Sequence, residues 1–149
     1  MSEESPQDAS GRPDVGRADV ELRLPADSAY VSVLRTTTAG LAARLDFTID
    51  DIEDLRIAVG EASALVLPEA DEGSDLVCRF FMSPGRLTVS VTVAATTPHT
   101  VDYDSFGWQV LTTLASEAAL EPGEGELTVR VAMVSDLADD SPTRAGAHR

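Results

Sequence analysis

The chain has 149 residues, enough for one domain with a single sizeable hydrophobic core. Its formal net charge is −15, and all of its basic residues other than histidine are arginines. This excess of carboxylates argues against direct binding of nucleic acid, because phosphates would be repelled. It fits a basic protein partner or simple solubility. The single cysteine, Cys78, excludes an internal disulfide.

Two further features concern the location of the protein and its domain limits. No apolar run approaches the roughly 18 residues of a spanning helix, and the start of the chain has no secretion signal. We therefore expect a cytoplasmic protein with no membrane segment. Residues 1–19 and 135–149 are poor in large apolar groups, so we predict two disordered tails around one folded domain at 20–134.

The first half of the domain begins with a short alternating segment, 20–24, which predicts a strand. Asp27 or Ser28 can cap the helix that follows. Its expected apolar stripe consists of Tyr30, Leu34, Thr37, Leu41 and Leu45. Thr48 is a good N-cap for a second helix, which ends before Pro68. The second apolar stripe consists of Ile52, Leu55, Val59, Ala62 and Val66.

The second half begins with two alternating segments, 75–82 and 87–93, joined by a turn at Ser83-Pro84-Gly85, which predicts a hairpin. Asp104 or Ser105 can cap a third helix. Its expected apolar residues are Phe106, Val110, Leu111, Leu114 and Ala118. Residues 121–125 are typical of a loop, and 127–133 alternate as a last strand.

This order of elements is strand, helix, helix, strand, strand, helix, strand. Because the strands alternate between an apolar and a polar face, helices should cover one face of the sheet only. We therefore predict an α+β fold, a two-layer sandwich with a mixed, mostly antiparallel sheet and helices on one face.

Glu61 is the first candidate functional residue. On the second helix it projects away from the apolar stripe, on a face that also carries Asp54, Ile57, Ala58 and Leu65. A lone carboxylate among apolar neighbours is either a catalytic base or a carboxylate that is solvated or paired with an arginine. The residues alone leave both interpretations open.

Two segments resemble a known family. Asp54 to Ala62, DLRIAVGEA, resembles the DLRLAVDEA helix of actinobacterial anti-sigma factors, and Ser105 to Ala115, SFGWQVLTTLA, resembles their SFSWHVLTALA helix. These factors are part of the serine-kinase branch of the histidine-kinase-like ATPase superfamily. The likeness covers roughly residues 20–133.

The resemblance implies a protein that sequesters an alternative sigma factor and is countered by an anti-anti-sigma protein. Kinase members act as homodimers, so the resemblance implies a possible homodimer here as well. They use ATP to phosphorylate a serine of that antagonist. In them a glutamate polarises the serine hydroxyl, and an asparagine four residues later holds Mg²⁺. Here Glu61 matches the glutamate, whereas Leu65 stands in place of the asparagine and has no lone pair for a hard cation.

The family's second motif, Asp-x-Gly-x-Gly, reads the adenine. Residues 94–100, AATTPHT, occupy that region and have neither the aspartate nor the glycines. Gly107 remains near the helix N-terminus where a phosphate would lie. Asp104 is the second candidate cofactor-binding residue, and Asp102 is another acidic residue nearby. Both of these aspartates also suit the simpler roles of loop acid and helix cap.

The first interpretation is therefore an anti-sigma factor with a degenerate nucleotide site, in which ATP and Mg²⁺ bind weakly or not at all. The alternative is an active serine kinase that uses Glu61, with nucleotide contacts re-formed by Asp102, Asp104 and the amides around Gly107. A third is a small interaction module with no sigma partner. His99 and His148 are isolated from other ligand residues, so no metal site is predicted.

Overall fold

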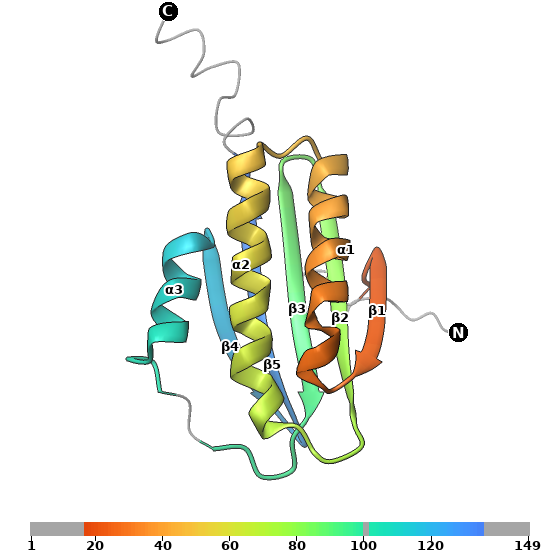
Figure 1. Cartoon of the computed structure of the whole chain (residues 1–149), viewed down its shortest axis with the longest axis vertical. Helices are drawn as coiled ribbons and strands as arrows, with labels where there is room; N and C mark the ends of the chain where they lie inside the picture. The colour runs from red at the N-terminus through yellow and green to blue at the C-terminus, as the bar shows by residue number, and fades with distance from the viewer. Residues whose placement is uncertain (1–16, 100–101, 136–149) are drawn as a thin grey trace, which may run out of the picture.

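The structure, a computed structural model, describes residues 17–99 and 102–135. Figure 1 shows two layers, with the helices packed side by side across one face of a twisted sheet. In chain order the elements are β1 (Val20–Pro25), η1 (Ser28–Tyr30), α1 (Val31–Arg44), α2 (Ile49–Val66), η2 (Leu67–Glu69), β2 (Asp75–Ser83), β3 (Arg86–Ala94), α3 (Phe106–Leu114), β4 (Glu117–Gly123) and β5 (Glu126–Val134).

The five strands lie in the order β1-β2-β3-β5-β4, and each neighbouring pair is antiparallel. The predicted α+β sandwich with helices on one face is thus confirmed, and its sheet contains no parallel pair among the described strands. The predicted hairpin is also confirmed: Ser83 pairs with Arg86 across Pro84-Gly85. Gly85 has a φ of 74°, a conformation that costs glycine little because it has no Cβ.

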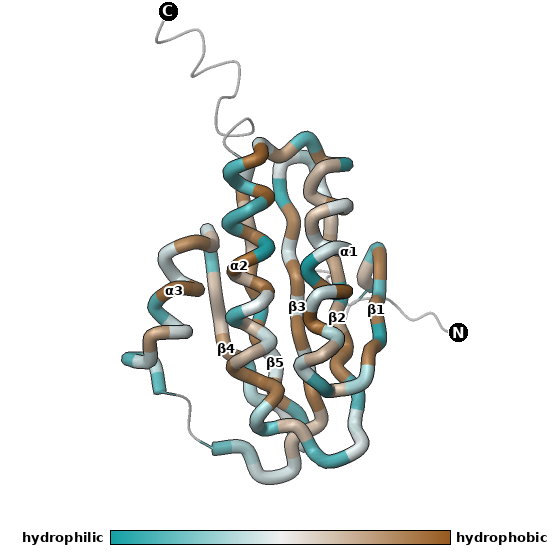
Figure 2. The backbone as a smooth tube through the Cα atoms, viewed as in Figure 1, coloured by the Kyte–Doolittle hydropathy of each residue, from teal (hydrophilic) through white to brown (hydrophobic). Residues whose placement is uncertain are grey.

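The core lies between the helices and the inward face of the sheet, as the predicted alternation requires. Figure 2 shows brown, apolar residues recurring along the central strands and along α2. The inward strand residues with less than 5% exposure are Leu76, Cys78, Phe80, Leu87, Val89, Val91, Val93, Leu127, Val129, Val131 and Met133. Burial raises the pKa of the Cys78 thiol to about 12, so this cysteine is an inert packing residue.

Helix α2 follows its prediction closely. The Thr48 hydroxyl accepts a hydrogen bond from the Asp51 amide at 3.0 Å, which makes Thr48 the N-cap. Of the predicted stripe, Ile52 is partly buried and packs against the core. The other four residues, Leu55, Val59, Ala62 and Val66, are completely buried.

Helix α1 differs from its prediction in phase. Asp27 caps the short η1 turn, which precedes the helix proper, and Tyr30 is 41% exposed at its end. The buried residues of α1 are Val31, Leu34, Thr38 and Ala42. Of the predicted stripe, Leu34 is completely buried, and Leu41 and Leu45 are partly buried and pack against the core. The buried Thr38 hydroxyl donates to the Leu34 carbonyl at 2.8 Å.

The prediction was wrong for the segment after α3. The helix ends at Leu114, and the predicted loop 121–125 is mostly strand: Glu117–Gly123 forms β4, with a turn at Glu124-Gly125. β4 lies at the edge of the sheet, where Pro122 is tolerated because an edge strand has one unpaired side. The sequence of β4, EAALEPG, lacks the apolar alternation of the inner strands, so the local pattern did not reveal this strand.

The two ends of the described chain are bonded to the sheet. The Asp19 amide donates to the Phe80 carbonyl at 2.9 Å, and its carboxylate accepts from the Met82 amide at 2.7 Å. The Ser135 amide donates to the Gly85 carbonyl at 2.8 Å. Residues 1–16 and 136–149 of the predicted tails lie outside the described residues. Among the described helices, none is long and apolar enough to cross a membrane.

Helix α2 provides the first testable prediction. Leu55→Ala should lower the free energy of unfolding by about 2–5 kcal/mol, because it removes buried methyl groups and leaves a cavity. The matched control is Ile57→Ala on the same helix, where the side chain is 46% exposed and the expected loss is below about 1 kcal/mol. Urea denaturation measures both, and equal losses would contradict the assignment of the buried face.

Candidate functional site

Glu61 lies on α2 where α3 packs against that helix. Its side chain is partly exposed, and its Oε1 atom is 3.0 Å from the point that a Cβ on Gly107 would occupy. The structure therefore brings together two of the three predicted site residues. A side chain at position 107 would meet the carboxylate, so glycine allows this close approach of helix and carboxylate.

The start of α3 gives this carboxylate a favourable environment. Ser105 is the N-cap: its hydroxyl accepts from the Trp108 amide at 3.2 Å. Gly107 lies in the first turn, where amide groups lack helical partners and the helix dipole favours negative charge. The Glu61 carboxylate lies beside this turn.

Leu65, one turn after Glu61, lies partly buried and packs against the core. A residue one helical turn away shares the same face, so a metal held jointly with Glu61 would need an oxygen ligand here. The leucine provides none. Among the described residues, no group of three or more His, Cys, Asp and Glu side chains is placed to hold a metal ion.

Asp104, the third predicted site residue, is exposed and bonds through its backbone. Its amide donates to the Asp102 carboxylate at 2.9 Å, and its carbonyl accepts from the Gln109 side chain at 3.0 Å. Asp102 therefore organises the turn that precedes α3. Nearby, the Tyr103 and Trp108 rings meet edge to face at 5.1 Å between centroids.

Phe106, predicted to pack in the core, is 80% exposed. It is the first residue of α3, and the helix turns Leu111 inward instead. Helical spacing alone did not reveal which residues of this short helix face the core. The exposed Phe106 side chain is consequently available on the surface near Glu61 and Gly107.

The segment in place of the family's Asp-x-Gly-x-Gly motif is tied to the rest of the sheet. Ala95 is 1% exposed, and its amide donates to the Gly125 carbonyl at 2.9 Å. Asp71 accepts from the Thr96 amide at 3.0 Å and from the Thr96 hydroxyl at 2.6 Å. Glu69 accepts from the His99 amide at 2.8 Å and contacts its Nδ1 at 2.9 Å.

We call this pair of carboxylates, Glu69 and Asp71, the carboxylate clamp. Hydrogen bonds from His99 hold the pKa of Glu69 below its usual value, and those from Thr96 do the same for the pKa of Asp71. Sequence reasoning missed both residues, because they lie in a polar loop with no motif. Only the pairing of β2 with β3 brings that loop beside residues 94–99.

Three arginines, Arg35, Arg23 and Arg44, lie in the first half of the described chain, and each has a different environment. The first, Arg35, crosses α2 at Gly60, where its Nη1 atom is 3.0 Å from the place of a glycine Cβ. The second, Arg23, is paired within the sheet with Asp75 at 3.2 Å. The third, Arg44, is exposed in the last turn of α1, where a cation suits the helix dipole.

The chain is similar in sequence to proteins of known name. No protein-family model matches the chain. The serine-protein kinase RsbW of Bacillus velezensis is 34% identical over 139 residues, which covers 79% of this chain and 85% of that protein. The RsbW protein of Halalkalibacterium halodurans is 43% identical over 74 residues, and there the chain spans 46% of the relative's length.

Solved structures show the same fold. The RsbU and RsbW domains of a Mycobacterium tuberculosis protein match with a TM-score of 0.61 and 18% identity, covering 78% of this chain and 32% of that one. The histidine kinase domain of a blue-light-activated kinase from Erythrobacter litoralis matches with a TM-score of 0.52 and 15% identity, covering 84% and 66%.

These likenesses show that the chain has the histidine-kinase-like ATPase fold. The chain belongs to the family of the serine-protein kinase RsbW. The predicted resemblance to anti-sigma factors of the serine-kinase type is thereby confirmed, whereas its placement in the actinobacterial branch stays a prediction.

The approach of Glu61 to Gly107 is testable with a double-mutant cycle. Gly107→Ala should be less favourable by about 1 kcal/mol in the wild type than in a Glu61→Ala background, because only the wild type has a carboxylate at the new methyl group. Unfolding free energies from urea denaturation give the coupling. Gly40→Ala is the control, since a Cβ there meets nothing within 4 Å, and it should show no coupling to Glu61.

The carboxylate clamp predicts a dependence of stability on pH. Because the pKa of Asp71 is lowered on folding, the ionised carboxylate stabilises the fold at neutral pH, and this contribution is lost as the pH falls below about 4. The melting temperature of Asp71→Asn should thus lie below that of the wild type at pH 7, with a difference that shrinks toward pH 3. Glu72→Gln, an exposed change in the same loop, should show no such trend.

Proposed function

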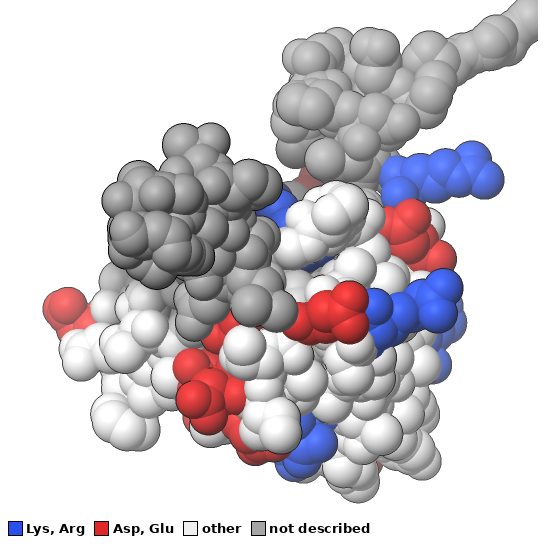
Figure 3. Space-filling view, turned by 90° about the horizontal axis from the view of Figure 1, so that it is seen from above, with Lys and Arg blue, Asp and Glu red and all other residues white. Residues whose placement is uncertain are grey.

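We propose that this protein is an anti-sigma factor that sequesters an alternative sigma factor and is countered by an anti-anti-sigma protein. The observation that carries the proposal is the likeness to RsbW over most of both chains. The DNA-binding surface of a sigma factor is basic, and the net charge of −15 complements it. Figure 3 looks onto one end of the molecule and shows acidic and basic side chains interspersed there, with no basic patch among the visible described residues.

The proposal includes weak or absent use of ATP. RsbW proteins are named as kinases and the fold is that of histidine-kinase-like ATPases, so ATP is the expected ligand of the family. The residues present here do not fit Mg-ATP well. Leu65 packs against the core where an oxygen ligand is needed, and Ala95 is buried where the family reads adenine. Thr96, next in the chain, is held by Asp71.

An active serine kinase is the second candidate. Two observations favour it: the relatives are named serine-protein kinases, and Glu61 is partly exposed beside the first turn of α3. In this role the Glu61 carboxylate would accept a hydrogen bond from the substrate serine and take its proton. Gly107 and its neighbours would offer amide groups to an anion, with Asp104 at the entrance of the helix.

Titration of the purified protein with Mg-ATP distinguishes the two candidates. We expect no saturable binding at micromolar concentration and no phosphate on the serine of the anti-anti-sigma protein, while the sigma factor still binds. Glu61→Gln should leave sigma binding unchanged. Micromolar binding of Mg-ATP, with transfer that Glu61→Gln abolishes, would establish the kinase instead. Failure to bind any sigma factor of the same cell would refute the anti-sigma function itself.

A further inference from the structure

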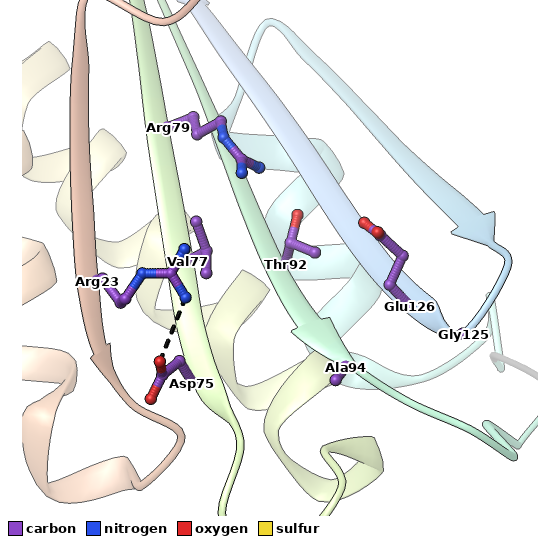
Figure 4. Close-up of a pocket in the computed structure, with 8 residues that line it drawn as sticks. All are labelled: Arg23, Asp75, Val77, Arg79, Thr92, Ala94, Gly125 and Glu126. Atoms are coloured by element: carbon purple, nitrogen blue, oxygen red, sulfur yellow. Dashed lines mark hydrogen bonds and ion pairs between the residues drawn. The ribbon is translucent and has the colours of Figure 1, made fainter.

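The face of the sheet opposite the helices carries a hollow that the proposed function does not use. Its volume is about 240 Å³, and residues of β1, β2, β3 and β5 line it together with the turn before β5. Figure 4 shows its side chains in front of the sheet, with the helices behind. Glu61 and the first turn of α3 lie on the helical side, so the hollow is separate from the site described above.

The floor of the hollow consists of small residues of β3 and their neighbours. Thr92 lies between Val77 on β2 and Thr128 on β5, and Ala94 follows two residues later on the same face. The Thr92 and Thr128 hydroxyls are joined by a hydrogen bond of 2.6 Å, which uses one of their two hydrogens. With Thr128 as the donor, Thr92 keeps a hydrogen that it can donate to a ligand in the hollow.

One wall of the hollow presents a cation with free donors. The Nε atom of Arg79 donates to Glu21 at 3.2 Å, and no described residue accepts a hydrogen bond from its two terminal nitrogens. Figure 4 shows this guanidinium reaching from β2 toward β3. Arg23, the other arginine of the hollow, is instead bonded to Asp75 at 3.2 Å. Arg79 is thus held in place by one bond and can bind a carboxylate with its other N–H groups.

The opposite wall presents a carboxylate with no partner. Glu126 is exposed at the start of β5, and among the described residues its carboxylate has neither an ion pair nor a hydrogen bond. Its Cγ atom is 3.2 Å from the place of a Cβ on Gly123, so the base of the side chain lies against the turn. In Figure 4 its carboxylate lies across Thr92 from Arg79. Two arginines and two carboxylates line the hollow, and their charges cancel.

We propose that this hollow binds a small zwitterion of the amino-acid class, with its carboxylate on Arg79 and its ammonium on Glu126. A simple anion would be repelled by Glu126 and by the net charge of −15, and a simple cation would meet two arginines. A ligand with both charges gives each wall a partner and adds no net charge.

The size of the hollow limits the ligand further. Its volume of about 240 Å³ equals that of roughly eight water molecules at about 30 Å³ each. This is room for a small metabolite and too little for a nucleotide. The inference goes beyond the proposed anti-sigma function and does not rest on it.

NMR titration of the ¹⁵N-labelled full chain with glycine, β-alanine and γ-aminobutyrate tests the proposal. The charged groups lie progressively farther apart in these probes. At least one of them should shift the amide signals of Thr92, Ala94 and Gly125 saturably in the millimolar range, because the ligand is small. Acetate and ethylammonium carry one charge each and should bind at least about tenfold more weakly, since each leaves one wall without a partner.

Glu126→Gln and Arg79→Gln should each weaken binding of the zwitterion at least about tenfold. The matched controls are Glu124→Gln in the neighbouring turn and Arg44→Gln on α1, two exposed positions that do not line the hollow, and both should bind like the wild type. Circular dichroism checks that each variant folds. Ala94→Leu is a second kind of variant, because it fills the hollow without removing a charge and should abolish binding.

Three results would overturn the proposal: no saturable shift with any of the zwitterions, binding of acetate as tight as theirs, or wild-type affinity in Glu126→Gln. Shifts centred on the helices instead of β2, β3 and β5 would also overturn it, because the ligand would then lie elsewhere. Failure of the protein to bind a sigma factor would leave this measurement unaffected.

Discussion

Burial of the apolar stripe of α2 against the sheet is the constraint on which the rest of the structure depends. Leu55, Val59, Ala62 and Val66 are removed from solvent on one side of the helix. This fixes the rotation of α2, and since residues three and four apart share a face, it also fixes the direction of Glu61. The carboxylate points toward α3 because the opposite side of the helix is committed to the core.

The second constraint is the close packing of α3 on α2 at a glycine. Helix α3, which Ser105 caps, passes close to the Glu61 carboxylate of α2. A small residue is needed at this contact, and Gly107 provides it. The same geometry would serve an anion in a nucleotide-binding relative. Here the neighbouring position on α2 is Leu65, whose side chain packs against the core. The histidine-kinase-like ATPase fold of this chain is thus compatible with the proposed function of binding another protein.

The two layers also divide the surface by charge. Most of the excess carboxylates lie on the helices and on the connections between the elements. On the sheet face that the helices leave uncovered, four arginines are paired with carboxylates of other strands: Arg23 with Asp75, Arg79 with Glu21, Arg86 with Glu117 and Arg130 with Glu121. Each pair is exposed and contributes little to stability on its own.

The sequence by itself determined the α+β class, the cap at Thr48, the Pro84-Gly85 hairpin and the buried side of α2, and it limited the cap of the third helix to Asp104 or Ser105. Each depends on a local pattern: a cap residue, a turn residue or an apolar period. The resemblance in two helices also gave the family, and it singled out Glu61 and Gly107.

Only the tertiary structure decided the rest. β4 follows α3 in a segment with weak alternation and becomes a strand by pairing with β5, and Phe106 is exposed although it lies at helical spacing with apolar residues. The carboxylate clamp joins residues 25 to 30 positions apart. Which residues lie side by side on the sheet face without helices depends on which strands become neighbours. Strand order is set by long-range packing, and no local sequence pattern contains it.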